Sequence, residues 1–382
     1  MRGYNKQPLG SVLRRAQESV VIDPQKTYKQ VTVRLFHKGL KLRGEKVGSA
    51  IRTTKQCVVH KGQVLLSRID ARNGAIGIVP PELDGAIVTN DFWAFEVNRD
   101  LADPAFLDAY FGTSEFVDAC NASSEGTTNR VRLQPSRFLR IDVPLPPRDV
   151  QRRIVSRIED IAGKIEKART LRKEIVSKQR NLLLSVYTKL IEGAKWRQMK
   201  EIAPLVRRPI TIDPLQEYNE LGIRSFGKGT FHKAAVSGAS LGSKRVFQIE
   251  PGDLLFNIVF AWEGAVAVAR PEDKGRVGSH RFLSCVPKNG SAVPSFLRFH
   301  FLTERGLEYL GIASPGGAGR NRTLGLEALA RMEVPVPPIE KQLQFASLMS
   351  RTDELDRVRT EAGKEIDSLM PSILSKAFSG EP

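Results

Sequence analysis

The chain repeats itself, and this constrains its fold more than any other feature of the sequence. When the sequence is shifted by about 190 positions, the Ile-Asp-Pro triplet at Ile22 falls on the triplet at Ile212, and Gly74 falls on Gly264. Further matches in this register are Tyr28 with Tyr218, Arg34 with Arg224, Phe36 with Phe226, Lys38 with Lys228, Phe106 with Phe296, and Gly126 with Gly316. Most matched residues are Gly, Pro or aromatic, types that form turns and cores, whereas the polar residues between them mostly differ. We therefore expect one scaffold, present twice, with two different surfaces; an old duplication without divided function is the alternative.

Each copy ends in a proline pair that is followed by a long helical pattern. Val-Pro-Leu-Pro-Pro from Val143 matches Val-Pro-Val-Pro-Pro from Val334, and Gln151 matches Gln342. Proline cannot continue a helix interior, and no proline follows from position 148 to 190. Apolar residues recur there at steps of three and four, as they do after the second pair, where Pro371 is expected to kink the helix or restart it.

These patterns predict two helices of about 40 residues, each about 60 Å long. The first is rich in Arg and Lys, and the second carries more Asp and Glu, so antiparallel pairing into a spacer is expected. The alternative is that each amphipathic helix lies flat on its own domain.

Within each copy, short apolar runs follow Gly62 and Gly252, and a helix is predicted over residues 104–116 and again over 294–310. The expected fold class is α+β, with two tandem domains joined by two long antiparallel coiled-coil-like helices in a pseudo-two-fold repeat. The expected boundaries are a first domain over residues 1–145, a central spacer helix over 146–192, a second domain over 193–336, and a C-terminal spacer helix over 337–382.

Charge and composition limit the possible partners. The net charge is +17 and the pI is about 9.9, which favours a polyanion such as nucleic acid; a merely soluble basic protein is the alternative. The three cysteines are far apart, so a reduced, cytoplasmic protein is expected. The first ten residues do not resemble a signal peptide, and no apolar run is long enough to span a membrane.

Motifs for catalysis are missing from the sequence. It contains no phosphate-binding GxxxxGK[ST] loop, no dinucleotide-binding GxGxxG turn, and no Asn/Asp-Pro-Pro-aromatic motif of an adenine methyltransferase. The histidines lack metal-ligand spacing. Asp84 and Glu96 could suggest a nuclease, but Asn98 stands where that pattern requires lysine. Together these absences favour a binding role without catalytic, cofactor or metal residues.

The doubled proline motif, its glutamine and the following helix resemble the specificity subunit of type I restriction–modification systems, which serve bacterial defence. The first helix pattern ends near Leu182, and the second ends in the run Ile373 to Glu381. The loop Ser-Ser-Glu-Gly-Thr-Thr from Ser123 is also similar to that family, whereas the matching loop from Ser314 departs from it.

The resemblance implies that each domain is a target recognition domain for one half of a bipartite, asymmetric site in double-stranded DNA. It also implies that the helices set the unread gap and dock two DNA adenine methyltransferase subunits, which bind S-adenosylmethionine. Motor–nuclease subunits, with ATP and Mg, can join such a complex, so cofactors are expected in partners and not in this chain. The alternatives are a stand-alone DNA-cleaving or DNA-modifying enzyme and a repeat-built regulator of a palindrome.

Candidate DNA contacts are Arg and Lys for phosphates and bidentate side chains for base edges, with a solvated surface charge as the alternative for each basic residue. In the first copy they are Arg34, Lys38, Arg68, Asp70, Arg72, Asn73, Asn90, Thr127, Thr128, Asn129 and Arg130. In the second copy they are Arg224, Lys228, Asn257, Trp262, His280, Arg281, Arg320, Asn321 and Arg322. The candidate partner-binding residues are Gln151, Arg152, Arg153, Arg157 and Gln342.

Arg130 and Arg320 form the strongest pair, because each lies in a glycine-rich polar loop and the two match across the repeat. A match of this kind favours a phosphate contact over the reading of different bases. Trp93 alternates with Phe95 and is expected in a core. Trp262 lies between turn residues, so a contact with a base or deoxyribose and a structural role both stay open.

Overall fold

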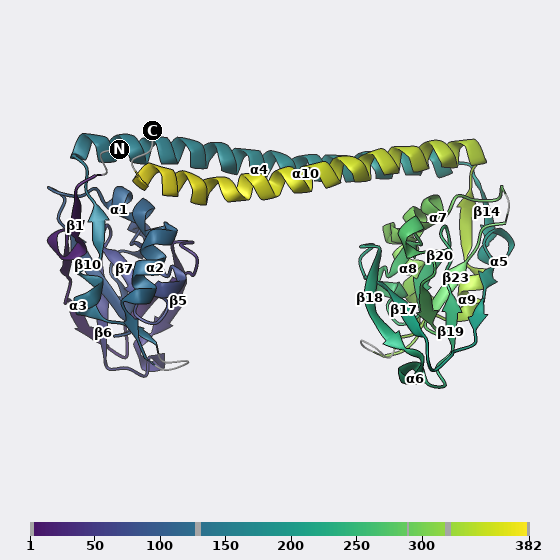
Figure 1. Ribbon diagram of the computed structural model, residues 1–382, viewed down its shortest axis with the longest axis horizontal. Helices are drawn as coiled ribbons and strands as arrows, with labels where there is room; N and C mark the ends of the chain where they lie inside the picture. The colour runs from purple at the N-terminus through teal and green to yellow at the C-terminus, as the bar shows by residue number, and fades with distance from the viewer. Residues whose placement is uncertain (1–3, 127–130, 289, 318–321, 380–382) are drawn as a thin grey trace. The chain divides into compact units, whose positions relative to one another are not determined.

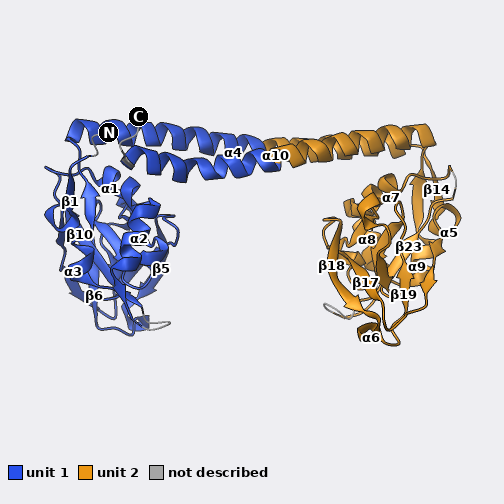
Figure 2. Cartoon of the chain, in the orientation of Figure 1, with its two compact units in different colours: residues 1–172, 360–382 blue, residues 173–359 orange. Residues whose placement is uncertain are grey.

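The computed structural model describes residues 4–126, 131–288, 290–317 and 322–379. The chain divides into two compact units, residues 1–172 with 360–382 and residues 173–359 (Figure 2). Unit 1 is therefore built from both ends of the sequence, whereas unit 2 is one continuous segment.

Unit 1 contains two main sheets (Figure 1). The four-stranded sheet has the order β2 (Leu13–Arg15), β10 (Phe92–Val97), β7 (Val64–Ser67), β8 (Ile76–Ile78). The five-stranded sheet has the order β3 (Ser19–Val21), β6 (Lys55–Val59), β9 (Ala86–Val88), β4 (Thr27–Val33), β5 (Leu40–Val47). Neighbouring strands are antiparallel except at a single parallel bridge between Gln30 and Ile87. Two smaller ladders join β1 (Lys6–Pro8) to β13 (Asp142–Pro144) and β11 (Ser124–Glu125) to β12 (Arg132–Leu133).

The helices of each unit are more broken than the sequence indicates. The single helix predicted over 104–116 is wrong, because α1 (Pro104–Phe111) ends before Thr113 and α2 (Ser114–Ala122) begins after it. The Thr113 hydroxyl accepts a hydrogen bond from the Phe116 N–H at 3.2 Å, which caps α2. Thr303 separates α7 (Pro294–Leu302) from α8 (Glu304–Ile312) in the same way, so the helix predicted over 294–310 is also two helices.

The two main sheets of unit 1 recur in unit 2 with the same strand order, which confirms the predicted internal repeat. Its four-stranded sheet has the order β15 (Leu205–Val206), β23 (Phe282–Cys285), β20 (Leu254–Asn257), β21 (Val266–Val268). Its five-stranded sheet has the order β16 (Pro209–Ile210), β19 (Val246–Gln248), β22 (Val277–Ser279), β17 (Glu217–Ile223), β18 (Thr230–Ser237). The parallel bridge recurs between Glu220 and Val277, and β14 (Lys195–Gln198) pairs with β24 (Glu333–Val336).

The remaining helices of the units are short. They are α3 (Pro135–Phe138) in unit 1 and α5 (Met199–Ile202), α6 (Gly238–Leu241) and α9 (Leu326–Arg331) in unit 2. Single 3-10 turns follow β7 and β20, and these turns, η3 (Ala71–Asn73) and η6 (Ala261–Glu263), become important for the site.

The two long helices, α4 (Arg148–Ile191) and α10 (Ile339–Ser379), each contribute to both units. In unit 1, Arg169 of α4 forms an ion pair with Asp367 of α10 at 2.6 Å. In unit 2, the Gln179 amide donates to the Thr352 carbonyl at 3.3 Å. Within each unit the paired segments run antiparallel, as predicted. The helix α10 continues through Pro371, so the predicted restart does not occur there.

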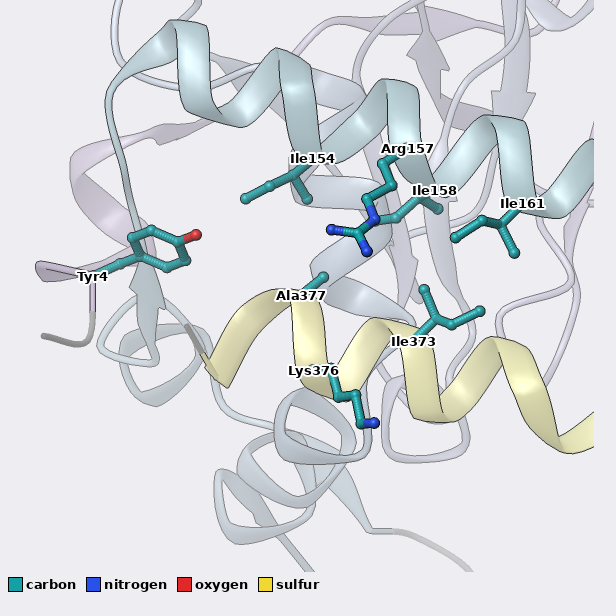
Figure 3. A pocket seen from close by; sticks show the side chains of 8 residues that line it. All are labelled: Tyr4, Ile154, Arg157, Ile158, Ile161, Ile373, Lys376 and Ala377. Carbon is teal, nitrogen blue, oxygen red and sulfur yellow. The ribbon is translucent and has the colours of Figure 1, made fainter. Parts of the chain in front are cut away.

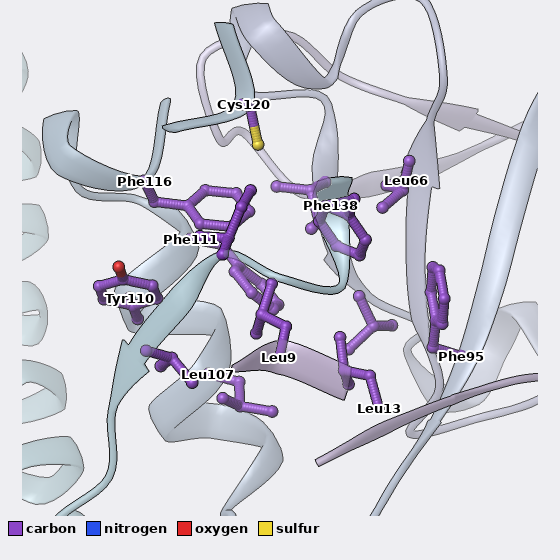
Figure 4. Packing of buried hydrophobic residues seen from close by; sticks show 14 of the residues in the cluster. Leu9, Leu13, Leu66, Phe95, Leu107, Tyr110, Phe111, Phe116, Cys120 and Phe138 are labelled. Atoms are coloured by element: carbon purple, nitrogen blue, oxygen red, sulfur yellow. The ribbon is translucent and has the colours of Figure 1, made fainter. Parts of the chain in front are cut away.

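The largest hydrophobic core of each unit includes the end of a long helix. The core of unit 1 contains Leu374 and Phe378 of α10, and the ring of Phe378 lies 5.0 Å from that of Phe106 (Figure 4 shows the centre of this core). In unit 2, Tyr187 of α4 packs 5.7 Å from Phe296, in the position that matches Phe378. Burial of one such ring stabilises the fold by about 2 kcal/mol, so the helices are anchored in the units.

Candidate nucleic-acid interface

The first group of candidate residues in unit 1 surrounds the ends of β7 and β10. The Arg68 N–H donates to the Asp91 carbonyl at 2.8 Å, and the Leu133 N–H donates to the Arg68 carbonyl at 2.8 Å. The backbone thereby joins the end of β7, the turn before β10 and the β12 strand at one place, which we call corner 1 (residues 15, 68, 90–93 and 132).

A tryptophan organises the cations of corner 1. Trp93 is only 2% exposed, which confirms its predicted core position, and the guanidinium carbons of Arg15 and Arg68 lie 4.9 and 4.8 Å from its ring centre. Burial, together with the charge of Arg68, lowers the pKa of Arg15 below its ordinary value. Arg132 lies at the rim, 3.5 Å from Asp91. Corner 1 therefore concentrates charge on an apolar base.

The matching place in unit 2 has the same backbone and different side chains. The Ile258 N–H donates to the Arg281 carbonyl at 2.9 Å, and the Leu324 N–H donates to the Ile258 carbonyl at 2.9 Å. A pocket of about 470 Å³ opens here, and we call it corner 2. Its lining residues are Ile258, Val259, Phe260, His280, Arg281 and Thr323. Corner 2 is an apolar hollow with a basic rim.

Next to each corner lies the 3-10 turn that follows the strand. In unit 1 the Asn73 amide donates to the Asp70 carboxylate at 3.3 Å, and Gly74 closes the turn with a left-handed φ of 73°. Arg72 is partly buried, and neither its Nε nor that of Arg68 has a hydrogen-bond partner among the residues the structure describes. The turn thus uses the side chains of Asp70 and Asn73 internally.

The corresponding turn of unit 2 holds its candidates more tightly. Asn257 accepts a hydrogen bond from the Val259 N–H at 3.0 Å, and the Trp262 indole N–H donates to the Val259 carbonyl at 3.0 Å. The Arg322 guanidinium lies 4.6 Å from the Trp262 ring centre and donates to the Gly311 carbonyl at 2.8 Å. These contacts give Asn257, Trp262 and Arg322 a structural role, while Trp262 stays half-buried.

A loop between two strands of the larger sheet carries the remaining described candidates of both units. Arg34 and Lys38 are exposed in unit 1, as are Arg224 and Lys228 in unit 2, although Arg224 also donates to the Thr230 carbonyl at 3.2 Å. The matched Phe36 and Phe226 were expected to serve the common scaffold, and this is wrong. They are 73% and 74% exposed. The repeated pattern Arg-x-Phe-x-Lys-Gly was the signal in the sequence that could have identified them.

Several candidates receive no structural description. Thr127, Thr128, Asn129, Arg130, Arg320 and Asn321 lie outside the described residues. The other exposed candidates are Asn90 and His280 at the two corners and Arg281 beside the pocket of corner 2.

The residues expected to bind partners fall into two classes. Gln151 is completely buried: its amide donates to the Leu101 and Pro146 carbonyls at 2.9 and 2.8 Å, and its oxygen accepts from the Asp103 N–H at 2.8 Å. Gln342 is also completely buried. Its amide donates to the Pro337 carbonyl and its oxygen accepts from the Val293 N–H, as those of Gln151 do with Pro146 and Asp103. Both glutamines fix the start of a long helix, so their assignment to a partner surface is corrected.

The three arginines of this group are exposed on the first turns of α4. Arg157 lines a pocket of about 250 Å³ in unit 1 between α4 and the end of α10, with Tyr4 at one end (Figure 3). Ile154, Ile158, Ile161 and Ile373 supply its apolar surface. Arg152 and Arg153 are exposed nearby on the same helix, and Arg153 pairs with Asp149 at 3.2 Å.

No group of three or more His, Cys, Asp or Glu side chains that could hold a metal ion occurs among the described residues. A separate search of the same residues finds no helix long and apolar enough to cross a membrane.

Comparisons with known proteins agree on one family. Residues 17–176 match the model of the type I restriction modification DNA specificity domain. A protein of Methanocaldococcus jannaschii, described as the MjaX specificity subunit of a type I restriction enzyme, is 20% identical over 346 residues, which cover 84% of this chain and 78% of that protein.

Two solved structures have the same fold over the whole chain. The HsdS subunit from Thermoanaerobacter tengcongensis has a TM-score of 0.60 and 21% identity, with coverage of 100% of this chain and 97% of that one. A chain from a study of complex assembly and conformational transition of the type I R-M system has a TM-score of 0.70 and 22% identity, covering 100% and 98%.

Proposed function

We propose that this chain is a specificity subunit of a type I restriction–modification system, because residues 17–176 match the model of the type I specificity domain, and that it reads a bipartite, asymmetric DNA site with one half-site for each unit. The observation that carries the proposal is the pair of corners. Equivalent backbone hydrogen bonds place Arg68 and Asp91 in one unit and Ile258 and Arg281 in the other. Two readers on one scaffold need this combination of a shared frame and different side chains.

The chemistry of the corners favours different bases. An arginine reads the O6 and N7 acceptors of guanine, and an aspartate accepts from the amino group of cytosine. Corner 1 carries both types, so we expect its half-site to contain a G·C pair. The apolar hollow of corner 2 fits the methyl group of thymine, with His280 and Arg281 available beside it.

The same proposal includes the partners and cofactors that the resemblance to specificity subunits implies. We expect the long helices to set the length of the unread gap and to dock two adenine methyltransferase subunits, with Arg152, Arg153 and Arg157 as exposed contacts on α4. Methylation, with S-adenosylmethionine, and any ATP- and Mg-dependent cleavage would then belong to partner subunits. Specificity subunits are non-catalytic by family, and we propose the same for this chain.

The test is a map of methylated adenines in cells with and without the chain, followed by replacement of residues 1–145 with the same segment of another family member. We expect a bipartite motif that disappears with the chain, and a replacement that changes one half-site only. A change in both halves, or DNA cleavage by the purified chain alone, would contradict the proposal.

A further inference from the structure

Both units present an exposed phenylalanine on the same loop. The pattern Arg-x-Phe-x-Lys-Gly covers residues 34–39 and 224–229, and the rings of Phe36 and Phe226 are 73% and 74% exposed. Isolated exposed apolar residues are ordinary on protein surfaces. A large ring in the same position of two units whose polar surfaces otherwise differ requires an explanation.

The backbone holds each ring in place. Phe36 has a φ of 58° and Phe226 a φ of 61°, a left-handed conformation that is disfavoured for residues with a Cβ atom. The Phe36 N–H donates to the Asn73 carbonyl at 2.7 Å, and the Phe226 N–H donates to the Glu263 carbonyl at 2.8 Å. The next N–H groups, of His37 and Gly227, donate to Gly74 and Gly264, both at 2.9 Å. Conformations of this kind persist where neighbouring structure enforces them, and they concentrate at functional sites.

These hydrogen bonds also attach the loop to the candidate interface. Their acceptors belong to the turns η3 and η6, which follow the corner residues Arg68 and Ile258 by a few positions. The exposed rings are therefore continuous with the surfaces assigned to DNA and do not form a separate patch.

A cation accompanies each ring. The Lys38 ammonium lies 5.8 Å from the centre of the Phe36 ring, and the Lys228 ammonium lies 5.8 Å from that of Phe226. A nucleotide offers the matching pair of features, an apolar base or sugar face beside a phosphate. Lysine is depleted in protein–protein interfaces, which makes a protein partner a poorer match for the repeated Phe–Lys pair.

We infer that Phe36 and Phe226 pack against a base or deoxyribose of bound DNA while Lys38 and Lys228 neutralise the adjacent phosphate. The match between the units means that this contact does not depend on sequence. The inference rests on the proposed function only for the identity of the ligand as DNA.

The test measures binding of the full-length chain to two fluorescent duplexes of unrelated sequence at several salt concentrations. The variants are Phe36→Asn, Phe226→Asn and the double variant, since Asn tolerates the left-handed conformation and keeps the loop. The matched controls are Val21→Asn and Leu215→Asn, which remove apolar side chains that are 73% and 95% exposed. Thermal unfolding followed by circular dichroism checks that each variant is folded.

We expect each Phe variant to weaken binding about tenfold on both duplexes alike, because packing of a ring on deoxyribose carries no sequence information. The slope of log affinity against log salt concentration should be unchanged in the Phe variants. Lys38→Met should make this slope shallower by the amount of about one phosphate contact. Phe36→Trp and Phe226→Trp should keep the affinity of the unmodified chain, and the emission of the new tryptophans should be quenched by DNA.

Unchanged affinity in folded Asn variants would overturn the inference, as would a loss confined to one duplex. If the variants instead lose co-purified methyltransferase and keep their DNA affinity, the rings are docking residues and the inference is wrong. Failure of the unmodified chain, with its partners, to bind any DNA would count against the proposed function itself.

Discussion

The clearest difference between the two units is the side chain chemistry at one matched point of the sheet. In unit 1, the guanidinium groups of Arg15 and Arg68 both lie against the ring of Trp93. In unit 2, the same three strand positions are occupied by Leu205, Ile258 and Leu283, with Leu205 on the β15 edge and Leu283 fully buried. A cationic stack has been replaced by three aliphatic residues without a change in strand order or register.

This difference shows how one scaffold can carry two recognition surfaces. The fixed parts are backbone hydrogen bonds and buried rings, which do not depend on the exposed side chains at the strand ends. Of the variable positions, Arg68 and Ile258 lie just beyond the last ladder residues, whereas Arg15 and Trp93 lie within the ladders, where a change of side chain leaves the backbone pairing intact. The experiments below either break the equivalence of the two units or define where it stops.

The largest expected effect is a loss of stability on replacing the buried glutamine that both units share. Gln151→Ala should destabilise unit 1 by about 3 kcal/mol, because it leaves the Asp103 N–H and the Leu101 and Pro146 carbonyls without their partner. Gln342→Ala should destabilise unit 2 by about 2 kcal/mol, through the Val293 N–H and the Pro337 carbonyl. Hydrogen exchange with mass spectrometry reports the opening of each unit separately.

The control is Arg153→Ala, which removes an exposed side chain from α4, the helix that carries Gln151, and should cost less than about 0.5 kcal/mol. If the amides of each unit are as well protected from exchange in the glutamine variant as in the unmodified chain, the proposed anchoring of the long helices is wrong.

A smaller effect should follow from exchange of corner residues. Arg68→Ile gives corner 1 the residue of corner 2, and we expect about tenfold weaker binding to the first half-site, because a bidentate guanine contact is worth about 1–3 kcal/mol. The second half-site should be unaffected. Competition with duplexes altered in one half at a time measures both, and Ile258→Arg supplies the reciprocal variant.

The two corner variants should be compared with a substitution that keeps the charge at corner 1. Arg68→Lys retains the cation but not the planar fork, so base preference should relax while non-specific binding stays. Equal losses on both half-sites for Arg68→Ile would mean that Arg68 supports the fold and does not read DNA.

The smallest expected effect is a pH dependence of the stability of unit 1 that comes from His60. His60 lies 3.0 Å from a Glu18 oxygen and 3.2 Å from an Asp84 oxygen. Partial burial lowers its pKa, but the hydrogen bonds and charges of the two carboxylates outweigh this, so the pKa of His60 is raised overall. In unit 2, Arg208 stands at the position that matches Glu18 and pairs with Asp253 at 2.6 Å. An arginine does not titrate near neutral pH.

A raised histidine pKa gives stability that is complete below the unfolded pKa and is lost as the pH rises through the folded pKa. Unit 1 should therefore lose about 0.3 kcal/mol relative to unit 2 between roughly pH 6 and 8, a small value because His60 is partly exposed. Hydrogen exchange at the two pH values measures the difference, and His60→Gln should abolish it. An unchanged loss in unit 1 of the His60→Gln variant would exclude His60 as the cause.

Much of the fold could be predicted because it depends on residues with few conformational options. The glycines, prolines and buried rings keep one register across the repeat, and they specify the turns and cores of both units. The break at Thr113 was missed because the apolar pattern runs on through it, and only the side-chain cap ends one helix and starts the next. The restart predicted at Pro371 was wrong, because a helix with tertiary support can continue through a proline.

The site was harder to predict than the fold, for a physical reason. Sequence patterns identify residue types, but the fate of a polar group depends on partners far away in the chain. Gln151 and Gln342 match across the repeat because they are buried, not because they face a partner. Phe36 and Phe226 match although they are exposed, and nothing in their spacing separates these two cases. The left-handed loop that explains them is visible only in the structure.

The contribution of α10 to the core of unit 1 has a consequence for synthesis on the ribosome. Leu374 and Phe378 emerge after every residue of unit 2, yet they complete a core whose other members begin at Leu9. Unit 2 is continuous from 173 to 359, so all of its residues are available earlier. The half of the protein that is translated first is thus the half that finishes folding last, and a chain that stops prematurely after residue 359 would leave unit 1 with an open core and exposed aromatic rings for quality-control proteases to recognise.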